Sequence, residues 1–148
     1  MKKLVLILAL ALSTALGAAL PGCAVSTPMR TLEGATEGLD TVLVVVTSAT
    51  LAAEGRREFF DQSLRVYRGM SAQDGLLSYS IRRELLGGEV WTLTVWRDRE
   101  ALRQFVRSPR HREAMERGLP AVVDMRTAEA VVDAASVPVT WSRALALL

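Results

Sequence analysis

The sequence predicts one α+β domain in which four strands and two helices follow the order β-α-β-β-α-β. Residues 41–47 form a run of β-branched and other apolar residues, and residues 76–96 hold two alternating stretches around a Gly-Gly pair. Such stretches are typical of paired strands. Apolar residues at helical spacing follow each of these regions, in residues 53–67 and 98–118. The chain of 148 residues is long enough for one such domain.

The first strand, residues 41–47, is apolar on both of its faces. A strand of this kind lies inside a sheet and is covered from both sides. The helices of the predicted order cover one face of the sheet only, so the other face needs a cover of its own. A second subunit that lays its sheet against the first would supply it. We therefore expect a homodimer formed through sheet faces.

A helix and a hairpin follow the first strand. The helix is indicated by Phe60, Leu64 and Tyr67, which share one helical face. In the hairpin, the strand of residues 90–96 alternates between two sets: Trp91, Leu93 and Val95, and Thr92, Thr94 and Trp96. We expect Trp91 to face the helices. The candidate pocket residues are Tyr79, Thr92, Thr94 and Trp96.

The second half of the chain is marked by helix-capping residues. Asp98 is a good N-cap for the second helix, and Ser108 followed by Pro109 restarts it. A last strand is expected within residues 125–135, followed by a short helix over residues 141–148. This order is the ferredoxin-like split βαβ arrangement.

The N-terminus has the pattern of a secretion signal. Lys2 and Lys3 precede the uncharged stretch of residues 4–20, which is at the lower limit of length for a membrane-spanning helix. Leu20-Pro21-Gly22-Cys23 resembles the lipobox of bacterial lipoproteins, although Pro21 departs from that pattern. The alternative is ordinary signal-peptidase cleavage near the single cysteine, Cys23.

These features predict three regions: a signal peptide over residues 1–22, a tether over residues 23–39 and a folded domain over residues 40–148. We expect Cys23 to carry a lipid that anchors the protein in the cell envelope, facing the periplasm. The two lysines account for the net charge of +2, so the rest of the chain is formally neutral. This balance argues against a nucleic-acid partner.

The residues that follow the hairpin carry a family resemblance. They are Trp91 to Asp98, Ala101, Leu102, Phe105, Ser108 and His111. Their order resembles the pattern of the antibiotic biosynthesis monooxygenase superfamily. That pattern is a strand that ends in Trp, an acidic cap, an Ala-Leu pair, Phe, and then Ser shortly before His. The resemblance extends over residues 41–148. It implies a dimeric α/β barrel with a small-molecule pocket between helices and sheet.

The resemblance also bears on cofactors. The haem-degrading branch of the superfamily carries a catalytic Trp and a haem-ligating His where this chain has Phe105 and Met115. Neither residue matches, so we expect no haem. Another branch oxygenates phenols without a cofactor, in an apolar pocket that deprotonates the substrate. Two alternatives follow: a cofactor-independent monooxygenase, or a non-enzymatic ligand-binding or envelope interaction module that keeps only the fold.

His111, the single histidine, is the candidate general base, and Arg82 is the candidate group for stabilising the substrate anion. The competing interpretation of His111 is a local hydrogen bond to a carbonyl near Ser108, which we favour because no partner constellation is visible. With one histidine and one cysteine, we expect no metal site. Convergence of His111 with Arg82 or Tyr79 in one pocket would favour the enzyme.

Overall fold

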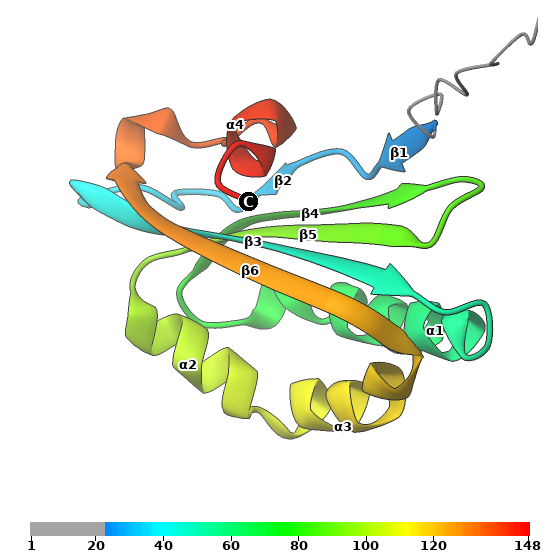
Figure 1. The fold of residues 1–148 in the computed structure, drawn as a ribbon. Coiled ribbons are helices and arrows are strands. Elements are labelled where there is room, and N and C mark those ends of the chain that lie inside the picture. Colours follow the sequence, from blue (N-terminus) through cyan, green and yellow to red (C-terminus); the bar gives the residue numbers. More distant parts are fainter. Residues whose placement is uncertain (1–22) are drawn as a thin grey trace, which may run out of the picture.

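The computed structural model describes residues 23–148, and the predicted signal peptide, residues 1–22, lies outside them. One antiparallel sheet carries three helices on one face and a short helix on the other (Figure 1). The strands are β1 (Ala24–Ser26), β2 (Arg30–Thr31), β3 (Thr41–Leu51), β4 (Leu76–Glu84), β5 (Glu89–Trp96) and β6 (Val122–Asp133). The helices are α1 (Arg56–Arg68), α2 (Arg99–Arg107), α3 (Pro109–Gly118) and α4 (Trp141–Leu145), with short 3-10 turns between some elements.

The longer strands confirm the predicted split arrangement. They lie side by side in the order β4-β5-β3-β6, with α1 in the first crossover and α2 and α3 in the second. Both predicted caps are present. The Asp98 side chain accepts a hydrogen bond from the backbone N–H of Ala101 at 2.8 Å, and Ser108 accepts one from that of His111 at 3.3 Å. These caps satisfy N–H groups that a helix leaves unpaired at its start.

The second face of the sheet is covered by the chain itself, which corrects the reasoning behind the predicted dimer. Val42, Val44 and Val46 are at most 1% exposed in the single chain. They pack against side chains from both ends of the described chain: Met29, Ala35, Leu39, Val137, Val139, Trp141, Ala144 and Leu148. Burying a valine or leucine side chain is worth about 1.5–3 kcal/mol, so this cover removes the need for a second subunit on this face.

The two covering segments meet over β4. The Ser80 hydroxyl, which is 1% exposed, donates to the Thr27 carbonyl at 2.9 Å and accepts from the Trp141 indole N–H at 3.1 Å. One buried serine therefore connects the N-terminal and C-terminal segments. It also satisfies the indole N–H of the partly buried Trp141, which would be costly to leave unpaired away from water.

The N-terminal segment differs from the predicted tether. β1 pairs with the end of β4, with Ala24 opposite Glu84, and β2 pairs with its beginning, with Arg30 opposite Tyr79. The ordered fold therefore begins at the start of β1 and not near residue 40. A sequence rich in Ser, Thr, Pro and Gly suggested a linker, but its backbone groups bond to the free edge of β4. No helix within residues 23–148 is long and apolar enough to cross a bilayer.

The hairpin places Trp91 on the opposite face to the one expected. Thr92 pairs with Ile81 and Thr94 with Tyr79, and these side chains point toward the helices. The set of Trp91, Leu93 and Val95 lies on the other face, where Leu93 and Val95 are fully buried. The prediction for Trp91 is therefore wrong. On the helix face, Thr92 and Thr94 line a pocket beside a buried apolar cluster.

Candidate functional site

A pocket of about 340 Å³ lies between the helices and the sheet. Its floor is formed by β3, β4 and β5, its walls by α1, α2 and α3, and one side by β6. Most of the lining is apolar, and it includes Val45, Ala49, Phe59, Val66, Ile81, Val90, Leu102, Phe105, Ala114 and Met115. This volume lies at the lower end of the range for small-molecule sites.

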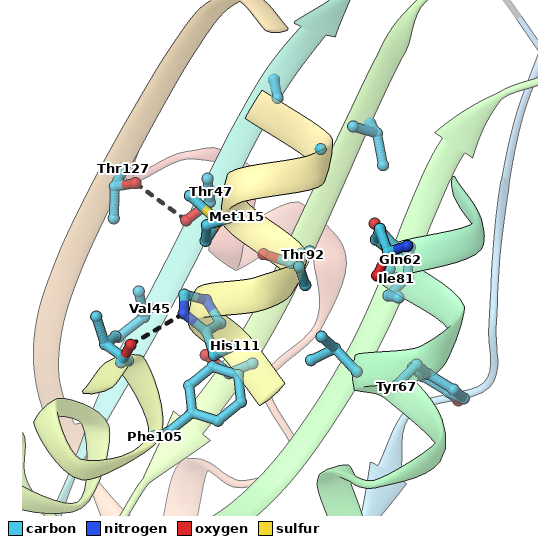
Figure 2. Close-up of a pocket in the computed structure, with 18 of the residues that line it drawn as sticks. Val45, Thr47, Gln62, Tyr67, Ile81, Thr92, Phe105, His111, Met115 and Thr127 are labelled. Carbon is cyan, nitrogen blue, oxygen red and sulfur yellow. Dashed lines mark hydrogen bonds between the residues drawn. The ribbon is translucent and has the colours of Figure 1, made fainter. Parts of the chain in front are cut away.

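A few polar groups interrupt the apolar lining. Figure 2 shows His111, Thr92 and Gln62 around the same space, together with a pair of threonines on neighbouring strands. In that pair, the hydroxyls of Thr47 on β3 and Thr127 on β6 are 3.0 Å apart. A mostly apolar pocket with a small number of polar groups is suited to a molecule that combines a ring or chain with one or two oxygens.

The His111 ring has a defined tautomer. Its Nδ1 lies 3.2 Å from the Val106 carbonyl oxygen. A carbonyl oxygen can only accept, so Nδ1 carries the hydrogen and donates it. The Nε2 atom is then left with its lone pair. The ring also packs on Phe105, with 4.6 Å between ring centroids (Figure 2).

Burial lowers the pKa of His111 below its ordinary value of 6.5, and the hydrogen bond to Val106 opposes this effect. Desolvation disfavours the imidazolium form because the partly buried ring has lost some of its contact with water. The lowered pKa therefore favours the neutral form of His111 at pH 7. A neutral imidazole with a free Nε2 can accept a proton from a bound molecule.

The structure contains a feature that each interpretation of His111 requires. The bond to the Val106 carbonyl is the local contact that the sequence favoured, and the ring nevertheless lines the pocket. Tyr79, Thr92 and Thr94, three of the candidate pocket residues, also line the pocket. The structure brings these four residues together.

Trp96 and Arg82 lie elsewhere. Trp96 lies on the helix-facing side of β5 but is fully buried and does not line the pocket; its indole N–H donates to the Thr94 hydroxyl at 2.8 Å and its ring packs on Phe105. Arg82 alternates with Ile81 on β4, so it points to the opposite face of the sheet, and its guanidinium lies 5.8 Å from the centre of the Trp91 ring. The predicted pairing of Arg82 with His111 is therefore absent from the pocket.

Sequence reasoning missed Gln62 and the threonine pair. Gln62 is the one residue of α1 that is buried, at 3% exposure, and its Nε2 donates to Glu58 at 2.8 Å. It stands three residues after Phe59 and four before Val66, so it shares their helical face. A polar residue on an otherwise apolar stripe was a usable signal. The Thr47–Thr127 pair joins strands 80 residues apart and had no local signal.

The two positions compared with the haem-degrading branch, Phe105 and Met115, both line the pocket. Neither matches the residues of that branch, and the expectation that no haem is bound stays a prediction. Among residues 23–148, no three His, Cys, Asp or Glu side chains gather as a metal site would require.

The comparisons with known proteins agree with this geometry. The profile of the family described as antibiotic biosynthesis monooxygenase matches residues 42–117. Those residues run from β3 almost to the end of α3, so they hold the three central strands and all three helices around the pocket. No curated protein matches the chain significantly.

Solved structures share the fold at low sequence identity. A candidate monooxygenase from Lactobacillus acidophilus matches with a TM-score of 0.57 and 13% identity, over 64% of this chain and 48% of its own length. A candidate antibiotic biosynthesis monooxygenase from Chloroflexus aurantiacus gives 0.53 and 18%, over 62% of this chain and 92% of its own. Rv0793 from Mycobacterium tuberculosis gives 0.54 and 20%, over 62% and 92%. The chain thus spans about half of the first protein and most of the other two.

Proposed function

Because the chain belongs to the antibiotic biosynthesis monooxygenase family, as the match over residues 42–117 shows, we propose that it binds a small aromatic molecule between its helices and its sheet. The observation that carries this proposal is the apolar pocket of about 340 Å³ with a few polar groups. Phe105 and the apolar side chains of β3 and α3 offer surfaces for a ring. Thr92, Gln62 and His111 offer hydrogen-bond partners for one or two oxygens.

The chemistry proposed for the pocket is oxygenation of a phenol by dioxygen without a cofactor. His111 Nε2 accepts the phenolic proton, and the phenolate then supplies electrons to dioxygen. One oxygen atom enters the ring to give a quinone, and the other leaves as water with the two hydrogens that the phenol has lost. The apolar lining supports this step because it keeps water away from the reacting anion.

Oxygen uptake with 1-naphthol as the probe tests this chemistry. We expect consumption of dioxygen by the purified chain, and a loss of about 10²–10⁴-fold in turnover for His111→Gln, as is typical when a general base is removed. His111→Gln retains a polar side chain, so thermal unfolding should show whether the fold is kept. Oxygen uptake that is unchanged in this variant would assign His111 a structural role only.

A non-enzymatic binding module is the second candidate, and the position of Arg82 favours it. The pocket offers one neutral base, and the arginine expected to stabilise an anion lies on the other face of the sheet. Binding of 1-naphthol without any oxygen uptake would support this candidate and contradict the enzymatic proposal.

We further propose that the protein is exported and anchored in the cell envelope through Cys23, facing the periplasm. The lipobox-like sequence supports this proposal, and Cys23 is exposed at the first described residue. Metabolic labelling with an alkyne fatty acid should label the wild-type chain and leave Cys23→Ser unlabelled. Equal labelling of both chains, or of neither, would contradict the anchor.

A further inference from the structure

The β4–β5 hairpin ends in two exposed leucines. Leu85 and Leu86 lie in the connection between Glu84 and Glu89, and they are 49% and 94% exposed. Hairpin connections usually hold Gly, Asn, Asp, Ser or Pro, because these residues suit the turn and the surrounding water. The glycines that suit this turn, Gly87 and Gly88, come directly after the leucines, so the leucines themselves are not required by the turn.

The start of the described chain lies beside this hairpin tip. The backbone N–H of Leu85 donates to the Cys23 carbonyl at 2.9 Å, and Ala24 pairs with Glu84. Val25, the next residue of β1, is itself 44% exposed. Figure 1 shows β1 at the same end of the sheet as the tip. Cys23 therefore lies about one strand spacing, roughly 5 Å, from Leu85 at the hairpin tip.

The sequence before this point is suited to a lipid surface. Residues 4–20 are uncharged and rich in Leu and Ala, and they end at the lipobox-like residues 20–23. Because β1 starts directly after Cys23, no flexible spacer separates a lipid on that residue from the folded domain. An anchor at Cys23 would therefore bring the hairpin tip to the membrane surface.

We propose that the hairpin tip, formed by Leu85 and Leu86 with Val25 beside it, enters the interfacial region of the lipid bilayer as a second contact. The inference rests on the proposed anchoring through Cys23. Transfer of exposed leucine side chains from water to the boundary between headgroups and acyl chains lowers the free energy of the system. The contact is apolar in character, because the charges next to the tip are of both signs: Glu84, Glu89 and Arg56, whose guanidinium lies close to Gly88. It therefore does not require anionic lipids.

Photo-crosslinking in the full-length chain tests this contact. A diazirine amino acid replaces Leu86, and a matched chain carries it at Val131, which is 68% exposed on β6. Val131 pairs with Leu43, whereas the tip is joined to β3 at Leu51, so the two sites are roughly 26 Å apart along the sheet. After irradiation of bacterial membranes, mass spectrometry identifies the adducts. We expect a phospholipid adduct at position 86 and none at position 131, in zwitterionic as well as anionic lipid.

Four results would overturn the inference: an adduct at position 86 with another protein, an adduct with residues 1–22 of the same chain, lipid adducts at both positions, or lipid adducts at neither position. Fatty-acid labelling of Cys23 in the same cells separates the two proposals. Labelling of Cys23 without a lipid adduct at position 86 would leave the anchor in place and remove the tip contact. A lipid adduct without labelling would support the tip contact and remove the anchor. Neither outcome depends on ligand binding in the pocket.

Discussion

At the scale of single residues, His111 connects the fold with the proposed chemistry. Its Nδ1 bond to Val106 fixes the ring, and burial holds the pKa of the imidazole below its ordinary value. The same bond that looks structural thus prepares Nε2 as an acceptor. Structural and functional roles of this histidine are compatible, and they can be separated only by measuring stability and turnover in the same variant.

The lowered pKa of His111 predicts a pH dependence of stability. In the unfolded chain the imidazole takes up its proton near pH 6.5, and in the folded chain it does so at a lower pH. The unfolded state therefore binds more protons as the pH falls below about 6.5, which lowers the free energy of unfolding. We expect the wild type to lose stability relative to His111→Gln between pH 7.5 and pH 5.5. Denaturant titrations of both chains measure this difference, and a constant difference over that interval would contradict the direction of the shift.

At the scale of elements, the N-cap of α2 at Asp98 allows a direct prediction about stability. Its side chain accepts from the Ala101 N–H at the start of α2, and this bond lowers the pKa of the carboxyl, with a further contribution from Arg97. Asp98→Ala should lower the free energy of unfolding by about 1 kcal/mol, as is usual for a lost N-cap. Asp98→Asn keeps an acceptor and should cost much less. Equal losses in the two variants, measured by chemical denaturation, would show that the cap is not the source of the stability.

The elements also show what sequence alone could predict. The central strand β3 and the caps at Asp98 and Ser108 follow from local patterns, and the structure confirms them. The orientation of Trp91 could not be read in this way, because both faces of β5 are covered and the alternation does not say which cover is the helical one. Thr92 and Thr94 were predicted to lie in the pocket, whereas Gln62 was missed although a polar residue on an apolar helical face was a usable signal.

At the scale of the whole molecule, the main difference from the prediction is that the chain itself covers the second face of the sheet. Residues from both ends of the described chain, such as Met29 and Trp141, close the face that was expected to bind a second subunit. The two segments that cover this face lie more than a hundred residues apart in the sequence, and the segment around Met29 contains few apolar residues. Local periodicity therefore gave no sign of them.

This cover predicts the mass in solution. Light scattering on the chain without residues 1–22 should give the mass of one chain at micromolar concentration, because the apolar sheet face is already buried. Twice that mass would show that the predicted homodimer exists and uses a surface other than this face. The exposed edge of β6, with Val123 and Val131, would then be the first surface to examine.

The central claim is that the pocket binds a small aromatic molecule, and calorimetric titration with 1-naphthol tests it most directly. Thr92→Phe places a ring in the pocket, whereas Trp91→Phe changes the neighbouring side chain on the opposite face of β5. We expect saturable binding to the wild type and to Trp91→Phe, and at least about a tenfold weaker affinity, or 1.4 kcal/mol, for Thr92→Phe. No binding to the wild type, or equal binding to all three chains, would contradict the account.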